Sequence, residues 1–393
     1  MDKLQEARKI ISQVDEEMAA LFVRRMEAAV QVAEYKKERG LPIFDGAREK
    51  EILEKGAARV TDPQLREHYV RFLQNNMDVS KDYQRQLLEG MHVAYSGVEG
   101  AFAHIAAGEI FPDTTLVGYP NFAAAYKAVL QGDCSCAVLP LENSSAGEVG
   151  QVTDMMFDSG LYVNGVYELA VRHDLLALPG AALSDIKTVI SHPQALAQCA
   201  PYLEKHGWDK REHSNTALAA KLVAESGDKS VAAIASVKTA ALYGLQVLEE
   251  NIHQSGSNTT RFGVFSRTEN AGLGKRVGDH FILLFTTRNQ AGALAKAIDI
   301  IGRHGFNMRT LRSRPRKDLL WEYYFYVELE GDLRGEEGRA MLQELEGCCD
   351  RVRVAGSFRA HCRIGEEAGL LRHQISQHFH LHVLRILFLH YLL

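Results

Sequence analysis

The sequence predicts a multidomain chain in which an all-helical segment, a two-lobed α/β segment and an α+β segment follow one another. Three observations predict this order. Residues 2–39 contain no Gly and no Pro, and their apolar residues recur at helical spacing. After about residue 91, short apolar strands alternate with alanine-rich helical stretches. From about residue 280 the expected elements run in the order βαββαβ, which is the ferredoxin-like plan.

The helical segment covers residues 1–89. A helix over residues 2–39 spans about 55 Å, which is longer than a small domain is wide. It must therefore pack on another long helix or on another chain. Asp45 is expected to cap a second helix from about 46 to 58, and Pro63 to lie in the first turn of a third helix that runs to about Glu89.

The α/β segment covers residues 91–268 and is expected to contain mostly parallel strands. Its strands are expected at "VAYSG", "TTLVGY", "CAVLPLE", "TVISH" and "SVAAIAS". The length suits two lobes with a cleft between them. In "ENSSAGEVGQV" and "SHPQALAQC", small polar residues stand where a strand ends and a helix begins, which is where α/β folds bind ligands and anions.

The remaining chain divides into a linker, the α+β segment and a tail. The glycine-rich stretch "NAGLGKRVGD" separates the α/β segment from the α+β segment, which covers residues 279–358. Residues 359–393 form a C-terminal extension of unknown role. Its histidines at 378, 380 and 382 have no carboxylate or Cys among them, so no metal site is expected there.

Composition narrows the class of function. A formal net charge of -5 with scattered basic residues gives no footprint for nucleic acid or for a membrane surface. The charged N-terminus is unlike a signal peptide, and six irregularly spaced cysteines do not make a disulfide scaffold, so a cytoplasmic protein is expected. The chain has no P-loop, no GxGxxG and no nameable Ser-His-Asp arrangement, so the residues of a kinase, a dehydrogenase or a hydrolase are missing. No cofactor is expected.

The spacing of three cations on the first helix decides which of them can bind the same ligand. Arg25 and Lys36 are 11 residues apart, so they project from one face about 16 Å apart and can close on one small anion. Arg8 is 17 residues, about 25 Å, from Arg25 and is rotated away by about 100°. Arg8 can share that ligand only if it comes from a second copy. Taken one at a time, such residues also read as caps or solvated surface charges.

The stretch "ARKIISQVDEEMAALFVRRMEAAVQVAEYKKERGLPIFDGAREKEIL" resembles the all-helical chorismate mutases over about 85 residues. Their pericyclic reaction needs no nucleophile, only a dicarboxylate held in a folded conformer and donors to its ether oxygen. The resemblance implies a chorismate site that Arg8 completes from a partner subunit. It implies Lys36 and Gln84 as donors to the ether oxygen, Glu49 on the ring hydroxyl, and as substrate-binding residues Arg8, Arg25, Asp45, Arg48 and Ser80.

"ENSSAGEV", "SHPQALAQC", "AALYGL" and "NTTRFGVFSR", in this order, resemble the prephenate dehydratases over residues 91–268. The resemblance implies a two-lobed fold of the periplasmic-binding-protein kind with the site between the lobes. Arg261 would bind a substrate carboxylate and Thr260 would hydrogen-bond the departing hydroxyl. Glu142, His192 and His213 stay open as proton donors. The implied substrate-binding residues are Glu142, Asn143, Ser144, Ser191, Gln194 and Gln198.

"NQAGALAKAI" and "RSRP" in the α+β segment resemble the amino-acid-binding ACT domains that are fused to dehydratases. The resemblance implies pairing between subunits, phenylalanine as effector, and feedback inhibition. Arg312 departs from the pattern, because many relatives have Glu there and a cation cannot receive an ammonium group. A merely structural ferredoxin-like domain is the alternative. The implied effector-binding residues are Gly292, Ala293, Leu294, Ser313 and Arg314.

Together these resemblances predict a bifunctional enzyme of phenylalanine biosynthesis, at least a homodimer, that converts chorismate through prephenate to phenylpyruvate. One alternative is a dehydratase that prefers arogenate. Another is an amino-acid-sensing protein that has lost its activity, against which the retained charged set of the helical segment argues.

Overall fold

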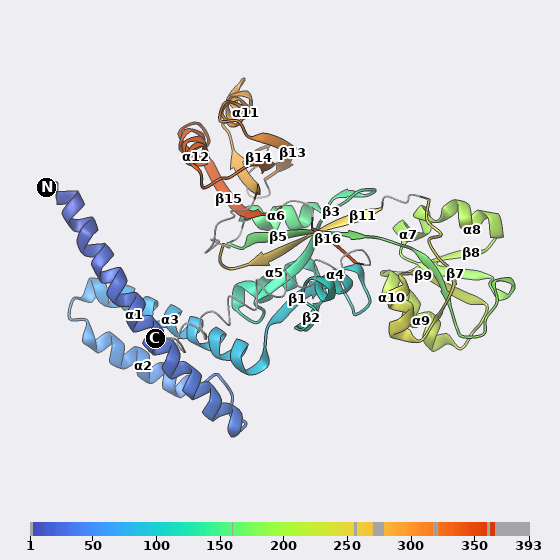
Figure 1. The fold of residues 1–393 in the computed structure, drawn as a ribbon, viewed down its shortest axis with the longest axis horizontal. Coiled ribbons are helices and arrows are strands. Elements are labelled where there is room, and N and C mark those ends of the chain that lie inside the picture. Colours follow the sequence, from blue (N-terminus) through green and yellow to red (C-terminus); the bar gives the residue numbers. More distant parts are fainter. Residues whose placement is uncertain are drawn as a thin grey trace, which may run out of the picture. The chain divides into compact units, whose positions relative to one another are not determined.

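The computed structural model describes residues 3–158, 160–254, 258–269, 279–316, 319, 321–359 and 362–365. The chain forms two compact units, Met1–His92 and Val93–Leu393 (Figure 1). The predicted linker and nearly all of the predicted C-terminal extension, with its histidines, lie outside the described residues. Among the helices that are described, none is both long enough and apolar enough to cross a membrane.

The helical unit contains the three predicted helices, α1 (Lys3–Glu38), α2 (Gly46–Arg59) and α3 (Pro63–Glu89). Asp45 caps α2 as predicted, since its carboxylate accepts a hydrogen bond from the backbone N–H of Arg48 at 3.0 Å. Pro63 opens α3, where its missing N–H leaves no helical bond unmade. Helix α3 packs against both α1 and α2.

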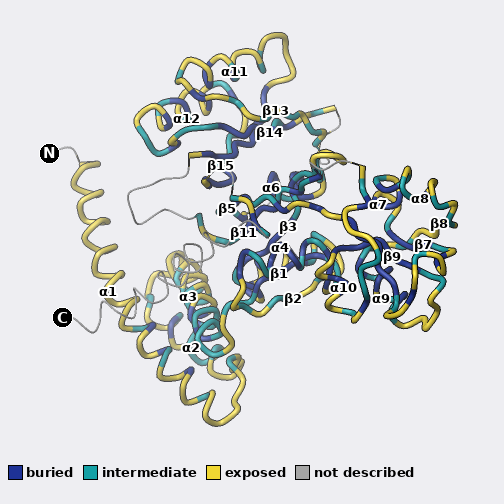
Figure 2. Tube along the Cα trace, turned by 45° about the vertical axis from the view of Figure 1, so that its right-hand side comes forward, coloured by how far each residue is buried: buried dark blue, intermediate teal, exposed yellow. Residues whose placement is uncertain are grey.

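Among the described residues, those of α1 that are buried lie in its C-terminal half. Its buried residues are Met26, Ala29 and Ala33. The N-terminal half exposes a row of large apolar side chains at helical spacing. The trace of this half is yellow in Figure 2, the colour of exposed residues. These side chains are Leu4, Ile11, Val14, Met18, Leu21 and Phe22. An exposed apolar row of this length indicates a packing partner, and the described residues do not supply one.

The second unit begins with a lobe built on one mixed sheet. The strand order is β16-β5-β11-β3-β1-β2, with β4 paired to β3. The strands are β1 (His92–Ser96), β2 (Thr115–Tyr119), β3 (Cys136–Asn143), β4 (Gly147–Glu148), β5 (Tyr162–Ala170), β11 (Thr259–Ser266) and β16 (Cys362–Ile364). The helices are α4 (Phe102–Ile110), α5 (Phe122–Gln131) and α6 (Gly150–Asp158).

The second lobe has its own sheet, in the order β10-β6-β9-β7-β8. Side chains of α7 and α8 cover one of its faces and side chains of α9 and α10 the other. The strands are β6 (Asp174–Ala177), β7 (Thr188–Ser191), β8 (Asp209–Glu212), β9 (Val231–Ala235) and β10 (Gln246–Glu249). The helices are α7 (Pro193–Gln198), α8 (Ala200–His206), α9 (Thr216–Ser226) and α10 (Val237–Tyr243), with a short 3₁₀ turn at Leu183–Asp185.

The expectation of mostly parallel strands is confirmed only for part of the segment. The pairs β1–β3, β7–β8, β7–β9 and β5–β16 are parallel, but β11 runs antiparallel to both β3 and β5, and β6 antiparallel to β9 and β10. The chain leaves the first lobe after β5 and returns as β11, which inserts between β5 and β3 (Figure 1). Buried strands are apolar in either orientation, so the hydrophobic pattern cannot reveal this reversal.

The C-terminal domain has the predicted ferredoxin-like topology. Its strands pair antiparallel in the order β13-β14-β12-β15. The elements are β12 (His280–Thr286), α11 (Ala293–Arg303), β13 (Asn307–Pro315), β14 (Tyr323–Glu330), α12 (Glu336–Cys348) and β15 (Arg351–Phe358). Helices α11 and α12 pack on one face of the sheet.

The opposite face of this sheet shares a hydrophobic core with the first lobe. Ile282, Leu284, Tyr324 and Tyr326 belong to the same buried cluster as side chains of α5, α6, β3 and β5. At Gly356 the backbone of β15 approaches β5 so closely that a Cβ would lie 2.1 Å from the carbonyl oxygen of Val163. With a φ of +143° as well, this position requires glycine. The backbones of this domain and of the first lobe are therefore in direct contact at this position.

Candidate functional site

In the helical unit, α3 carries a buried polar face next to a cation of α1. Ser80 and Gln84 are both buried on α3, and the guanidinium of Arg25 donates to the carbonyl of Asn76 at 3.0 Å, one turn before Ser80. The Oε1 atom of Gln84 is buried without a hydrogen-bond partner among the described residues. Leaving such an atom unpaired costs about 1–3 kcal/mol, so Gln84 Oε1 is a candidate for contact with a ligand.

Glu49 reaches the same helix through a lysine that the sequence did not single out. Lys81 lies 2.8 Å from Glu49 and 2.9 Å from Asp78. Burial lowers the pKa of Lys81, but its bonds to Glu49 and Asp78 outweigh this and raise the pKa above its usual value. The three-residue spacing of Asp78 and Lys81 reads as an ordinary surface pair on a helix, so it gave no signal.

The other predicted mutase residues bond to other partners or are exposed. Lys36 donates to the carbonyl of Ile43 at 2.5 Å, while Asp45 caps α2. Arg48 pairs with Glu51 at 2.6 Å and is largely exposed. Arg8 is exposed on the uncovered half of α1. Within one chain, Arg25 therefore contacts α3, the helix that carries Ser80 and Gln84, whereas Arg8 and Arg48 are exposed.

The second unit contains a connected set of polar side chains where the two lobes meet, here called the amide cluster: Asn143, His173, Gln198, Asn258 and Thr260. Asn143 Nδ2 donates to Asn258 Oδ1 and to Thr260 Oγ1, both at 2.9 Å. Asn258 Nδ2 donates to Gln198 Oε1 at 3.1 Å. His173 Nε2 lies 2.8 Å from the same Oε1. Three predicted site residues, Asn143, Gln198 and Thr260, thus belong to one hydrogen-bonded group.

Asn258 and His173 were not predicted as site residues. Both lie where the chain crosses between the lobes: His173 between β5 and β6, and Asn258 immediately before β11. Both are almost fully buried. The motif that carried the resemblance contains Asn258, but a buried Asn beside a strand reads equally well as a turn or cap. His173 stands outside every motif, so only the fold brings it to Gln198.

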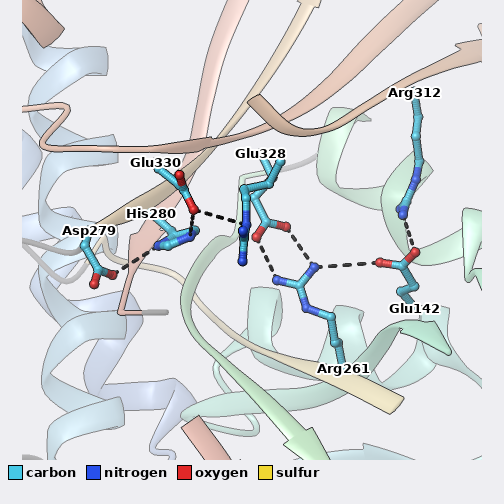
Figure 3. Close-up of polar contacts among 8 residues, drawn as sticks. Glu142, Arg261, Asp279, His280, Arg312, Glu328 and Glu330 are labelled. Atoms are coloured by element: carbon cyan, nitrogen blue, oxygen red, sulfur yellow. Dashed lines mark hydrogen bonds and ion pairs between the residues drawn. The ribbon is translucent and has the colours of Figure 1, made fainter. Parts of the chain in front are cut away.

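Thr260 and Arg261 lie on opposite faces of β11, since neighbouring residues of a strand alternate. Their register partners on β3 are Asn143 and Glu142, which alternate in the same way. Thr260 and Asn143 therefore share one face of the sheet and Arg261 and Glu142 the other, whereas the sequence led us to expect Thr260 and Arg261 in one cleft. Arg261 turns instead to Glu328 on β14 of the C-terminal domain (Figure 3).

A charged network occupies this second face. Arg261 binds both carboxylate oxygens of Glu328, at 3.0 and 2.7 Å, and lies 3.7 Å from Glu142. Arg312 of β13 pairs with Glu142 at 2.5 Å (Figure 3). Burial lowers the pKa of Arg261, but the bonds to Glu328 outweigh it and raise the pKa overall. Glu142 therefore meets two cations, Arg261 and Arg312.

The remaining predicted dehydratase residues have structural partners. Ser144 is exposed and its Oγ accepts from the backbone N–H of Thr259 at 3.0 Å. Ser191 is fully buried and donates to the carbonyl of Ile234 at 2.7 Å. Gln194 is exposed in the first turn of α7, which His192 caps. His192 Nδ1 accepts from the backbone N–H of Gln194 at 3.2 Å and His213 Nδ1 lies 3.5 Å from Ser214 Oγ, and neither partner belongs to the amide cluster.

The predicted effector residues divide between two elements. Gly292, with a φ of +82°, precedes α11, and Ala293 and Leu294 form its first turn. Ser313 is exposed on β13. Arg314 faces the first lobe, where it binds Asp154 of α6 at 2.7 Å, and Tyr324 donates to the same carboxylate at 2.8 Å. The pair with Asp154 raises the pKa of Arg314. Arg314 is thus a contact between the domain and the first lobe.

Within the described part of the chain, no group of three or more His, Cys, Asp or Glu side chains is arranged to hold a metal ion.

Comparison with protein families gives two matches. Residues 93–270 match the family model of prephenate dehydratase, and residues 7–85 match that of chorismate mutase type II.

Individual relatives extend these matches. The bifunctional chorismate mutase/prephenate dehydratase of Escherichia coli (strain K12) is 32% identical over 366 residues, which cover 89% of this chain and 95% of that protein. A solved prephenate dehydratase from Arthrobacter aurescens, in complex with L-Phe, superposes with a TM-score of 0.63 at 28% identity, over 68% of this chain and 90% of that one. The solved structure of GqqA, described as a novel type of quorum quenching acylase, gives a TM-score of 0.63 at 32% identity, over 68% of this chain and 97% of that one.

Proposed function

The chain belongs to the family of bifunctional chorismate mutase/prephenate dehydratases, and we propose that its first unit rearranges chorismate to prephenate and its second unit converts prephenate to phenylpyruvate. The observation that carries the dehydratase half is the bond from Asn143 Nδ2 to Thr260 Oγ1 at 2.9 Å. Because Oγ1 accepts this bond, the hydroxyl proton of Thr260 is left to donate to a ligand.

The proposed dehydration uses that proton. In prephenate, the bond from the ring to its carboxylate breaks to release carbon dioxide, the electron pair enters the ring, and the bond to the ring hydroxyl breaks. The departing oxygen must gain a proton to leave as water. Thr260 donates its hydrogen bond to this oxygen, and the Asn143 amide stabilises the negative charge that grows on Oγ1. The amide thus makes an otherwise weak alcohol donor more acidic.

The same geometry argues against acyl transfer, the activity that the name of GqqA describes. An acylase of this kind needs a nucleophile beside a general base. The side chain bonded to Thr260 is the amide of Asn143, which cannot take up a proton. Among the described residues of the amide cluster, the imidazole of His173 is bonded to Gln198 rather than to Thr260.

For the mutase half, we propose that the buried face of α3 receives chorismate. Arg25 and Ser80 bind the substrate, and the Nε2 of Gln84, with Lys36, donates to the ether oxygen as that bond breaks. Glu49 would bind the ring hydroxyl, with Asp45 and Arg48 at the opening of α2 closing the site. The buried Oε1 of Gln84, which has no partner among the described residues, supports a ligand at this face of α3.

We further propose that the active assembly is at least a homodimer. The uncovered apolar row of α1 is suited to the equivalent helix of a second copy, and Arg8 stands on the same half of α1. A second copy packed there would carry Arg8 toward the partner's substrate, as the sequence spacing requires.

The C-terminal domain is proposed to be an ACT domain that binds phenylalanine. The L-Phe complex of the Arthrobacter relative supports this class of effector. Gly292, Ala293, Leu294 and Ser313 are the proposed contact residues, while Arg314 takes the role of a tether to Asp154. Feedback inhibition would then pass through a sheet that packs directly on the dehydratase lobe.

One experiment tests both activities. Purified full-length protein is supplied with chorismate, prephenate or arogenate, while chorismate absorbance and phenylpyruvate or phenylalanine formation are followed. Consumption of chorismate and formation of phenylpyruvate from prephenate are expected, with inhibition of the second step by phenylalanine. Turnover of arogenate alone would overturn the substrate assignment, and an intact protein that consumes neither acid would favour a sensor.

A further inference from the structure

The orientation of every side-chain amide in the amide cluster follows from backbone donors. The N–H groups of Ser145 and Ala146 donate to Asn143 Oδ1 at 3.0 and 2.9 Å. A backbone N–H cannot accept, so the oxygen of the Asn143 amide faces this loop. Its nitrogen therefore faces Asn258 and Thr260.

The same logic passes from Asn143 to the second lobe. Because Asn143 Nδ2 donates to Asn258, the atom that it meets is the oxygen, Oδ1. The nitrogen of Asn258 then faces Gln198 and donates to Oε1. With Oε1 held on this side, the nitrogen of Gln198 points away from Asn258 and has no partner among the described residues. Gln198 is half-buried, so this nitrogen remains accessible to a ligand.

His173 completes the chain of donors. Since Gln198 Oε1 can only accept, the Nε2 of His173 carries the proton in the bond of 2.8 Å. Its Nδ1 is buried without a partner among the described residues. Burial lowers the pKa of His173 to about 4, so the ring stays neutral and keeps this tautomer near neutral pH.

We propose that Asn258 is a positioning residue of the dehydratase site, which fixes the Gln198 amide with its two N–H groups toward the substrate and holds Asn143 so that Thr260 must donate outward. This inference rests on the proposed dehydratase function. Asn258 is almost fully buried and reaches the substrate only through its neighbours. Its two bonds link a residue of the first lobe to a residue of the second, so they also set the distance between Thr260 and Gln198.

Asn258→Asp tests the proposal with almost no change of shape. The substituted side chain presents an acceptor to Gln198 Oε1, so the Gln198 amide must rotate and turn its oxygen toward the substrate. A substrate carboxylate would then meet an acceptor. The KM for prephenate is expected to rise about tenfold to a hundredfold, with a smaller fall in kcat. The matched control is Asn164→Asp, an amide on β5 that donates to Ser266 of β11, whose kcat/KM should stay within twofold.

A double-mutant cycle separates positioning from a general loss of packing. If Asn258 acts through Gln198, then Asn258→Asp combined with Gln198→Leu should lose no more than about threefold beyond the worse single variant. Losses that multiply fully, or an Asn258→Asp protein with wild-type kcat/KM, overturn the proposal. If Asn258→Asp does not fold, as judged by its melting temperature, Asn258→Ala is put through the same cycle with the same two outcomes. Wild-type protein that forms no phenylpyruvate would instead overturn the proposed function itself.

Discussion

Arg261 and Glu328 form a two-pronged ion pair, with 3.0 Å between Nη1 and Oε2 and 2.7 Å between Nη2 and Oε1. Arg261 follows Thr260 in β11, and Glu328 belongs to β14 of the C-terminal domain. The residue next to the proposed catalytic hydroxyl is therefore held by the proposed regulatory domain. Only 4% of the Glu328 side chain is exposed, so its charge depends on Arg261 for compensation.

Removing one partner of this pair should be far more damaging than removing both. Arg261→Met leaves the buried Glu328 carboxylate without its paired cation, and a loss of about 3–5 kcal/mol is expected. Arg261→Met with Glu328→Leu removes both charges and should recover most of that loss. Melting temperatures of the three variants give the comparison. Equal or additive losses would show that the pair has no energetic coupling.

The second arginine of β13 predicts a route for inhibition. Arg312 pairs with Glu142, which precedes Asn143 in β3, while its neighbour Ser313 is a proposed effector contact. In Arg312→Gln the link from β13 to β3 is lost. Phenylalanine inhibition of the dehydratase is expected to weaken by at least about fivefold, with little change in uninhibited kcat.

Arg309→Gln supplies the matched control for that measurement. Arg309 lies on the same strand but pairs with Glu330 at 3.1 Å, inside the C-terminal domain. Its variant should keep the wild-type inhibition constant, measured as the phenylalanine concentration that halves phenylpyruvate formation. Equal inhibition constants for wild type, Arg309→Gln and Arg312→Gln would exclude this route.

The sequence predicted elements better than it predicted which side chains meet. The cap at Asp45, Pro63 at the start of α3 and the βαββαβ order were confirmed, because they depend on local propensity and hydrophobic period. The reversal of β11 and the separation of Thr260 from Arg261 depend on how distant strands pair. A motif places two neighbours in one site, whereas the pleat of a strand points them to opposite faces.

Gln84 predicts a trade of activity for stability in the mutase unit. Its buried Oε1 has no partner among the described residues, so Gln84→Leu removes an unsatisfied polar group while nearly keeping the volume. The melting temperature of the helical unit is expected to rise. Mutase kcat is expected to fall about a hundredfold, because a donor to the ether oxygen is lost. An unchanged rate with either stability outcome would exclude Gln84 from the reaction.

Subunit exchange tests whether Arg8 serves a partner's site. Arg8→Ala and Lys36→Ala proteins should each lack mutase activity, since each removes a cation from the proposed site. When the two are mixed and allowed to exchange, a mixed dimer contains one site with both residues intact. After random exchange about half of the dimers are mixed, and each mixed dimer has one intact site of its two. Recovery of up to about a quarter of wild-type activity is therefore expected. If Arg8 acts within its own chain, mixing restores nothing, and the unmixed Arg8→Lys protein gives the reference for charge alone.

His173 predicts a pH-dependent stability of the second unit. Its pKa is lowered to about 4 by burial, whereas the imidazole of an unfolded chain titrates near 6.5. Between these values the unfolded chain binds the extra proton, so the free energy of unfolding falls as pH is lowered from about 6.5 and levels off below about 4. The full loss from this residue is of the order of 3 kcal/mol. Urea unfolding at several pH values, with wild type and His173→Asn, measures it: the variant should lose this part of the pH slope. A variant with the wild-type slope would mean that His173 has the same pKa in the folded and the unfolded chain, which would contradict a pKa lowered by burial.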